Sequence, residues 1–315
     1  MDSSSEFTIA GRSWSLHRSR ASGGGKIYKS IDGSSYLRTD SPKSIRDEVT
    51  FAKELHHLNF PVPKVEESGE LKDEAYFIEN SLGNETFGAT FRREFKESGI
   101  VSDETFRQYC LISKDFLEAQ LKSAKKFVGS KNDMRKSIHV DTVLDENPDL
   151  NSHFVLQAVD KAIARTADLP SVLTHGDLNP FNILQKGVID FEHSFIAPAG
   201  YDVIGNIFYG RFWNFRDELG EQKLSYDFAD KQVKAYLYAV DKIAEKHNIE
   251  KLSDFIDDFL LLKSIWSLCH EKKLAHASGS YNKWHFRKAV LLYCLEQYST
   301  EKPIDTKAFS VLKYS

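Results

Sequence analysis

The sequence predicts an α+β protein with a small antiparallel sheet near its N-terminus and a larger, mainly helical remainder. Short alternating apolar runs separated by glycine turns occupy the first part of the chain. Apolar residues at helical spacing dominate from about residue 103 onward. A polar loop and a short hairpin interrupt this pattern between residues 175 and 192. The length of 315 residues suggests one large domain or two lobes, and we expect two lobes, over residues 1–80 and 81–315.

The N-terminal part is predicted to begin with three strands, over residues 14–18, 26–31 and 35–39, which form an antiparallel meander. Ser41 and Pro42 then signal the start of a helix, which carries Ile45 and Val49 on its apolar face. Pro61 and Pro63 end this segment, and two further strands are expected over 64–68 and 75–79. The first 80 residues therefore read as a five-stranded sheet with one helix.

The second part is predicted to be mainly helical. The periodicity supports helices over residues 103–127, 154–166, 228–246, 252–276 and 284–298, and residues 86–97 read as a helix or an insertion. The polar stretch 129–151 gives no usable pattern. Tyr209, Phe212, Trp213 and Phe215 crowd one segment, and we favour core packing over a substrate pocket for them.

The most informative stretch runs from a strand at residues 171–174 through a polar loop into a hairpin that ends near Glu192. With a turn at Lys186 and Gly187, Asn182 and Asp190 meet at the open end of the hairpin, beside Asp177. Hard oxygen ligands of this kind suit Mg²⁺. Asp177 is then left as the base or orienting group for a hydroxyl nucleophile. The plain alternative is a polar turn whose Asp and Asn side chains cap local backbone groups.

Composition restricts the partners of the protein. The net charge of −4 gives no support for nucleic-acid binding. Three cysteines without metal-ligand spacing favour reduced thiols, and no apolar stretch approaches the ~20 residues that a membrane span needs. The polar N-terminus does not read as a signal peptide. We therefore expect a cytoplasmic protein that is a monomer or homodimer, without a nucleic-acid or membrane partner.

His175-Gly176-Asp177 and Ile189-Asp190-Phe191-Glu192 resemble the motifs of the aminoglycoside phosphotransferase and choline kinase family. The resemblance implies a two-lobed, protein-kinase-like fold in which the lobe over residues 1–80 covers a nucleotide. It assigns Asp177 as the catalytic residue and Asn182 and Asp190 as ligands of Mg²⁺.

The same resemblance implies roles for residues of the N-terminal lobe. Arg38 would meet the nucleotide phosphates and Glu48 would hold its head group. Gly23, Gly24 and Gly25 would bring backbone N–H groups near the phosphates, although a mobile hairpin tip explains them equally well. Glu79 and Ser81 fall at the adenine-reading hinge. In the helical lobe, Asp202 would brace the catalytic loop and His175 would be structural.

The function implied is transfer of the γ-phosphoryl group of ATP to a hydroxyl of a small molecule, with GTP still open. The acceptor could be an aminoglycoside, an amino alcohol or a sugar-like compound, and a cationic acceptor fits if an acidic C-terminal cleft exists. The acidic or titratable candidates for such a cleft are Asp217, Glu218, His270 and Glu271. The alternatives are a protein kinase, which lacks support because no Ala-Pro-Glu-like segment is found, a nucleotide-binding scaffold without turnover, and a metal-dependent phosphohydrolase.

Overall fold

The computed structural model describes residues 7–19, 25–127, 131–150, 152–216, 219–221 and 226–314. Contacts divide the chain into two compact units. The first comprises the chain up to Thr86 together with Ile183–Ile189, and the second comprises Phe87–Asn182 and Asp190 onward. The boundary predicted at residue 80 therefore differs from the observed division by six residues and by the hairpin.

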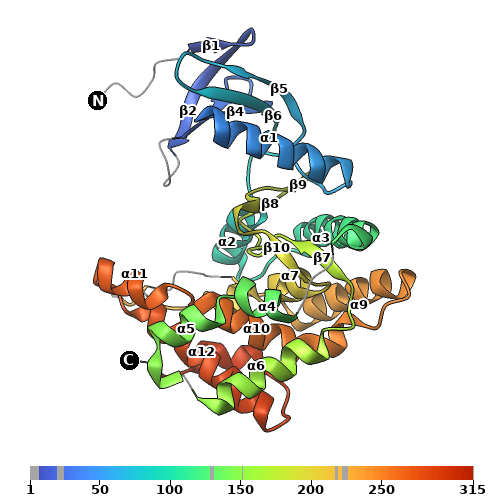
Figure 1. Ribbon diagram of the computed structural model, residues 1–315, viewed down its shortest axis with the longest axis vertical. Helices are drawn as coiled ribbons and strands as arrows, with labels where there is room; N and C mark the ends of the chain where they lie inside the picture. Colours follow the sequence, from blue (N-terminus) through green and yellow to red (C-terminus); the bar gives the residue numbers. More distant parts are fainter. Residues whose placement is uncertain are drawn as a thin grey trace. The chain divides into compact units, whose positions relative to one another are not determined.

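The first unit is built on a six-stranded antiparallel sheet with the order β1-β2-β3-β4-β6-β5 (Figure 1). Its strands are β1 (Phe7–Ile9), β2 (Arg12–Ser19), β3 (Lys26–Ser30), β4 (Ser35–Asp40), β5 (Val65–Glu70) and β6 (Ala75–Asn80). The five predicted strands are confirmed, and β1 is an addition. The sequence gives little sign of β1 because three residues are too short for an alternating pattern.

The two faces of this sheet carry different apolar clusters. Helix α1 (Pro42–His57), capped by the Ser41 side chain, packs Ile45 and Val49 against Phe77 on one face. Trp14, Leu37 and Ile78 form the cluster on the other face. Because side chains alternate along a strand, Arg38 must lie on the α1 face, opposite Phe77 in the register. The predicted helix and its apolar face are confirmed.

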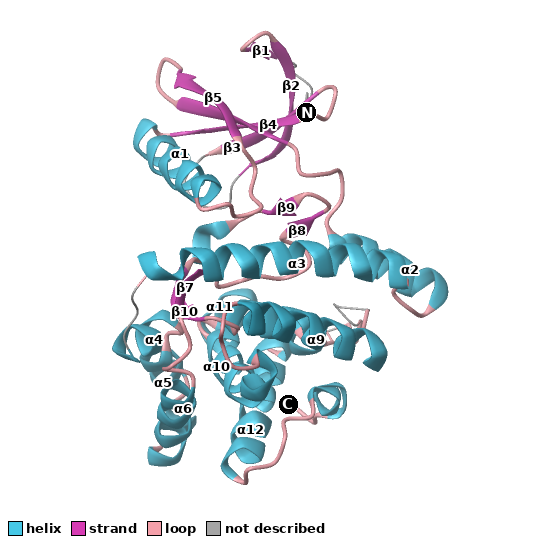
Figure 2. Cartoon of the chain, turned by 90° about the vertical axis from the view of Figure 1, so that its right-hand side faces the viewer, coloured by secondary structure: helices cyan, strands magenta, loops and turns pink. Residues whose placement is uncertain are grey.

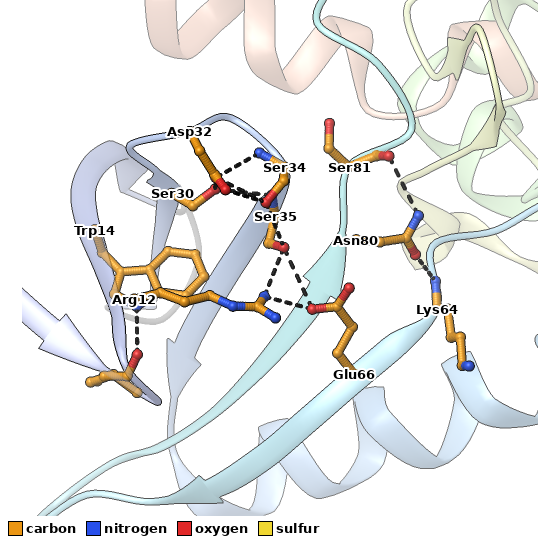
Figure 3. A network of polar contacts seen from close by, with 11 residues as sticks. Arg12, Trp14, Ser30, Asp32, Ser34, Ser35, Lys64, Glu66, Asn80 and Ser81 are labelled. Carbon is orange, nitrogen blue, oxygen red and sulfur yellow. Dashed lines mark hydrogen bonds and ion pairs between the residues drawn. The ribbon is translucent and has the colours of Figure 1, made fainter.

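A network of polar side chains ties the turns of this sheet together (Figure 3). Asp32 accepts hydrogen bonds from Ser30 Oγ at 2.6 Å and from the backbone N–H of Ser34 at 3.0 Å. These bonds lower the pKa of the Asp32 carboxyl to about 2. Arg12 reaches Glu66 at 2.6 Å, so that β2 is joined to β5. The network fixes the β3–β4 turn by satisfied polar groups.

The hairpin of β8 (Ile183–Leu184) and β9 (Gly187–Val188) belongs to the first unit. Val188 N donates to Pro61 O at 2.6 Å, and Lys186 N donates to Leu82 O at 3.0 Å. Ile183 pairs with Val188, so the turn is Gln185-Lys186 and the predicted turn at Lys186 and Gly187 was wrong. Gly187 is needed within the strand because a Cβ there would lie 2.2 Å from Pro61 O, at a φ of +156°.

The second unit is mainly helical, as Figure 2 shows by colour. Its α-helices are α2 (Phe87–Ser98), α3 (Asp103–Ser123), α4 (Lys131–Ser137), α5 (Val140–Glu146), α6 (His153–Arg165), α7 (Tyr201–Ile207), α8 (Tyr209–Phe212), α9 (Asp230–Lys246), α10 (Ile256–Leu268), α11 (Glu271–Ser278) and α12 (Asn282–Ser299). Short 3-10 turns occur at Ala124–Lys126, Pro148–Leu150, Phe191–His193, Leu252–Phe255 and Thr306–Val311. Two strands, β7 (Ser171–Thr174) and β10 (Phe195–Pro198), pair antiparallel.

The helical core of this unit is organised around α10, which packs against α6, α7 and α12. Its Phe259, Leu260, Leu261 and Leu262 are all fully buried. The single helix predicted over residues 252–276 was wrong, because the left-handed conformation of His270, with a φ of 61°, separates α10 from α11. The predicted α+β class, with a small antiparallel sheet and a mainly helical remainder, is confirmed.

Candidate active site

The polar loop begins where β7 ends, and buried Asp202 holds its backbone. Asp202 Oδ2 accepts the N–H of His175 at 2.7 Å, and Oδ1 accepts the N–H of Gly176 at 3.1 Å. Gln120 of α3 donates to Oδ2 at 3.1 Å. The predicted bracing role of Asp202 is confirmed by these contacts. Burial raises the pKa of the Asp202 carboxyl, while the charge of His175 and the backbone donors lower it.

Gly176 is required at its position by the backbone itself. Its φ is +79°, and a Cβ there would lie 2.1 Å from the carbonyl oxygen of His193. Any side chain would therefore push the loop away from the segment after Asp190. This glycine is the second residue of the His-Gly-Asp motif.

Lys263 of α10 supports the same loop from inside the helical unit. It is 5% exposed, and its Nζ donates to the carbonyl oxygen of Gly176 at 2.6 Å. The ammonium also lies 3.8 Å from the centre of the Trp266 ring. Burial lowers the pKa of Lys263 to about 8, against the charges of Asp177 and Asp202, which raise it. The loop backbone is thus fixed by one buried carboxylate and one buried amine.

Asp177 is half-buried, and its two oxygens have different surroundings. Oδ2 accepts a hydrogen bond from Asn179 Nδ2 at 3.1 Å. Oδ1 is buried and has no hydrogen-bond partner among the residues that the structure describes. A buried carboxylate oxygen without a donor is costly, so it usually has a role in binding or catalysis. The geometry leaves this oxygen available to accept a proton from a bound molecule.

Asn179 and Phe181 complete the loop. Asn179 Oδ1 accepts the N–H of Phe181 at 2.8 Å, which is the local capping expected of an Asx residue in a turn. Gly88 N of α2 donates to the carbonyl oxygen of Pro180 at 2.8 Å, and a Cβ at Gly88 would lie 2.6 Å from the Phe181 ring. The loop is therefore anchored against α2 as well as α10.

Asn182 and Asp190 flank the hairpin, and their side chains suit a hard cation. Asn182 Nδ2 donates to the carbonyl oxygen of Asp177 at 3.1 Å, so its amide oxygen faces away from that bond. Asp190 adopts a left-handed conformation with a φ of 72°, and its carboxylate makes no hydrogen bond or ion pair within the described part of the chain. One amide and one carboxylate oxygen fit Mg²⁺, which keeps waters and phosphate oxygens as its other ligands. The described residues contain no cluster of three or more His, Cys, Asp or Glu side chains able to hold a metal.

Arg38 of the sheet unit is held mainly by a carboxylate other than the expected one. Its Nε donates to Glu79 Oε1 at 2.8 Å, whereas Nη1 lies 4.0 Å from Glu48 Oε2. The guanidinium also lies 5.8 Å from the centre of the Phe77 ring. Arg38 and Glu79 are diagonal neighbours on the α1 face of β4 and β6, so strand pairing brings them together. Glu48 is the secondary partner.

The other nucleotide-binding candidates are placed as follows. Glu79 lies inside β6, paired with Tyr36 on one side and Val65 on the other, and its carboxylate is directed to Arg38. Ser81 follows β6; its N–H donates to Ser34 O at 2.8 Å and its Oγ to Gly83 O at 3.1 Å. Gly25 is buried next to β3, and Gly23 and Gly24 lie outside the described residues.

Aromatic rings and two cations extend from the polar loop further into the helical unit. Phe181 lies 6.3 Å from Tyr209 of α8, and Tyr209 stacks on Trp213 at 5.3 Å between ring centres. Arg287 of α12 lies 3.4 Å from the centre of the Trp213 ring, and Lys283 lies 4.9 Å from it. Burial raises the pKa of Tyr209.

Sequence reasoning missed two buried cations of this unit, Lys263 and Arg287, and the partly exposed Lys283. A usable signal existed, because Lys263 interrupts an otherwise apolar helical run from Phe259 to Trp266. Of the acidic candidates, Glu271 is buried and paired with Arg287 and Lys283. His270 is exposed and lies 3.1 Å from Glu146, while Asp217 and Glu218 lie outside the described residues.

Comparisons with known proteins agree with this arrangement. Residues 115–238 match the model of the phosphotransferase enzyme family, and this segment contains the loop, the hairpin and Asp202. Comparison of the sequence with curated proteins gives no match. In the searched part of the chain, no helix combines the length and apolar character that crossing a membrane requires.

Solved structures extend the likeness to nearly the whole chain. A thermostable mutant of aminoglycoside phosphotransferase APH(4)-Ia, in ternary complex with AMP-PNP and hygromycin B, is 15% identical over 90% of this chain and 94% of that one, with a TM-score of 0.56. Plasmodium vivax ethanolamine kinase is 16% identical over 91% of this chain and 83% of its own, with a TM-score of 0.51. The resemblance predicted from the sequence is confirmed: the chain has the kinase-like fold of the aminoglycoside phosphotransferases, and its residues 115–238 match the phosphotransferase enzyme family.

Proposed function

We propose that this protein transfers the γ-phosphoryl group of ATP to a hydroxyl of a small molecule. The coarser statement, a phosphotransferase of the small-molecule kinase type, rests on the family match over residues 115–238. Transfer to a hydroxyl is supported by the different surroundings of the two Asp177 oxygens. One oxygen accepts a hydrogen bond from Asn179, and the other is buried without a donor among the described residues. A hydroxyl group is the donor that such an oxygen lacks.

In the proposed reaction, Asp177 Oδ1 accepts a hydrogen bond from the acceptor hydroxyl and takes its proton as the oxygen attacks. The new oxygen–phosphorus bond forms at the γ-phosphorus, the bond to the β-phosphate oxygen breaks, and ADP leaves. Asn179 keeps the Asp177 carboxylate from rotating. Asp177 is positioned before the acceptor binds, because Asp202 holds the N–H of Gly176 and Lys263 holds its carbonyl oxygen.

Asn182 and Asp190 would hold Mg²⁺, which neutralises charge on the transferring phosphates when bound. In the sheet unit, Arg38 would bind nucleotide phosphates, with Glu79 and Glu48 orienting its guanidinium. Gly23, Gly24 and Gly25 with Ser81 remain candidates for nucleotide contacts through the backbone. We take ATP as the co-substrate because APH(4)-Ia was solved with AMP-PNP, an ATP analogue.

The test of this proposal is ADP release with a panel of hydroxylated compounds. The panel includes aminoglycosides, ethanolamine, sugars and hydroxy acids, with ATP and GTP compared and Mg²⁺ present or chelated. Asp177→Asn should lower kcat by about 10²- to 10⁴-fold, the usual contribution of a general base, with ATP affinity kept within a few-fold. Asp190→Ala should weaken nucleotide binding only when Mg²⁺ is present.

The matched control is Asp168→Asn, because Asp168 is an exposed aspartate of the same unit. It should leave turnover unchanged. Normal turnover in Asp177→Asn would contradict the role of this carboxylate. Nucleotide binding without ADP release for any compound would favour a scaffold instead of an enzyme.

A further inference from the structure

Arg287 is a buried cation with unused hydrogen-bond donors. It is 3% exposed, and its Nη1 donates to Ser267 O and Glu271 Oε1. Its Nε and Nη2 have no hydrogen-bond partner among the residues that the structure describes. Burial lowers the pKa of Arg287 to about 10, which leaves the guanidinium charged at neutral pH. A charged group buried in this way normally has all its donors satisfied, so a missing partner indicates a ligand.

The two unpartnered groups have a specific geometry. Nε–H and Nη2–H lie on one edge of the guanidinium plane and point in parallel. This edge is the fork that matches the two oxygens of a carboxylate. An ammonium group has no acceptor for these donors, and a single hydroxyl oxygen would have to accept both hydrogen bonds itself, whereas a carboxylate offers one oxygen to each.

The position of Arg287 connects it to the proposed catalytic residue. It lies on Trp213, which stacks on Tyr209, and Tyr209 lies beside Phe181 of the catalytic loop. The charges of Arg287 and Asp177 are close enough to interact electrostatically. All of these residues belong to the helical unit. These ring contacts link the cluster to the loop that carries Asp177.

The charge of the cluster is positive. Lys283 lies 2.9 Å from the carboxylate of Glu271, which also accepts from Arg287. Two cations share one carboxylate, so the three side chains carry a formal charge of +1. One bound carboxylate would neutralise the cluster, whereas a phosphate dianion would reverse its sign and an ammonium would add to it. The expectation of a cationic acceptor finds no support here, because Glu271 is already committed to two cations.

We propose that the acceptor is a hydroxylated carboxylic acid, whose carboxylate binds to the Nε–Nη2 edge of Arg287 with Lys283 as the second cation. The identification of this ligand as the phosphoryl acceptor rests on the proposed function. Binding of the carboxylate at Arg287 does not depend on turnover. Arg287 and Lys283 would thus determine specificity, while Asp177 acts on the hydroxyl at the other end of the same molecule.

The first experiment measures binding to nucleotide-free protein by calorimetry. The probes are glycerate, threonate, 3-hydroxybutyrate and L-homoserine, each paired with a compound that lacks the carboxylate: glyceramide, threitol, 3-hydroxybutyramide and homoserinol. Glycerol 3-phosphate, ethanolamine and hygromycin B represent phosphate and cationic ligands. We expect at least one carboxylate to bind about tenfold or more tightly than its partner, since a hydrogen bond to a charged group has that effect.

Substitutions in α12 test where the carboxylate binds. Arg287→Gln should weaken the binding of that carboxylate about tenfold or more, and Lys283→Gln should weaken it less. Lys288→Gln is the matched control, because Lys288 lies on the same helix and pairs with Asp149 outside the cluster. It should bind as the wild type does. If Arg287→Gln does not fold, Lys283→Gln decides, since Lys283 is partly exposed and its loss leaves the Arg287–Glu271 pair intact.

The inference is overturned if no carboxylate binds better than its partner, if glycerol 3-phosphate or a cation binds best, or if the folded cluster variants bind as the wild type does. ADP release with the same compounds is measured separately. Arginine-dependent carboxylate binding without any turnover would contradict phosphotransfer but not the site. Turnover with a neutral or cationic acceptor that is insensitive to Arg287→Gln would contradict the site but not phosphotransfer.

Discussion

Two buried charged groups in the helical unit, Asp202 and Arg287, differ in how fully they are paired. Both Asp202 oxygens accept backbone N–H groups of the polar loop at His175 and Gly176, and Gln120 adds a third donor. Arg287 uses Nη1 but leaves Nε and Nη2 without partners among the described residues. The comparison teaches that burial alone does not distinguish a structural charge from a binding one. The number of unsatisfied donors or acceptors does.

The physical reason is the cost of desolvation. A charge removed from water is stable only if the protein returns the hydrogen bonds that water made. Both oxygens of Asp202 are hydrogen-bonded within the protein, so this carboxylate can hold the loop in place. Arg287 has only some of its hydrogen bonds within the described protein, and a ligand can supply the others. The same criterion separates the two oxygens of Asp177, of which only Oδ2 is paired.

The largest effect should follow from a substitution at Asp202, whose two oxygens are both hydrogen-bonded. Asp202→Asn replaces one accepting oxygen with an NH₂ group that faces a backbone N–H of His175 or Gly176. We expect a loss of about 2–4 kcal/mol in the free energy of unfolding, because a buried donor is left unsatisfied. The loop should shift as well, so that kcat falls about 100-fold. Urea unfolding and steady-state kinetics measure the two effects.

Asp141→Asn is the control for this change, because the Asp141 side chain is 87% exposed. It should alter neither quantity. A fully stable Asp202→Asn protein with wild-type kcat would mean that the brace has no energetic importance, and the contrast with Arg287 would fail.

The second prediction concerns the pH dependence of Lys263. Burial lowers its pKa to about 8 from the ordinary value of 10.5. Above pH 8 the unfolded chain binds more protons at this amine than the folded chain, so this group makes stability rise with pH up to about 10.5. Lys263→Met removes this contribution to the pH dependence of stability. Between pH 8 and 9.5 the wild type should gain about 1.5 kcal/mol in unfolding free energy relative to this variant.

Unfolding free energies at several pH values give the difference between the two proteins, in which the other titrating groups cancel. Parallel pH profiles would show that Lys263 keeps an ordinary pKa in the folded protein. It would then follow that the amine is more hydrated than its burial implies.

The smallest effects are expected in the sheet unit, where Arg38 is held by two carboxylates. Arg38→Gln should raise the KM for ATP about tenfold, since it removes one charge-assisted contact to phosphate. Glu79→Gln should raise it about threefold by loosening the guanidinium, and Glu48→Gln less, because the contact is 2.8 Å to Glu79 and 4.0 Å to Glu48. A larger effect of Glu48→Gln than of Glu79→Gln would reverse the assignment of partners.

The sequence by itself determined the class of fold, five of the six strands of the sheet, α1, and the motif that contains Asp177, Asn182 and Asp190. These features are local: alternation, helical spacing and loop residues leave their pattern within short stretches of chain. Asp202 was predicted through the family resemblance, which implies a bracing Asp soon after the Pro/Gly turn at residues 198–200. The helix break at His270 and the hairpin turn were not, since both depend on contacts that fix the backbone, as Pro61 does at Gly187.

Only the tertiary structure decided which charges meet. Glu79 reaches Arg38 because β4 and β6 pair in one register, and Lys263 reaches Gly176 across 87 residues of chain. Arg287 and Glu271 lie 16 residues apart on two helices whose angle no periodicity reports. Pairing and burial of charges arise from long-range packing. This packing determines how many hydrogen bonds to water each group loses, and therefore how many the protein must replace. A sequence pattern records where a charge is along the chain, but its partners in space are set by the fold.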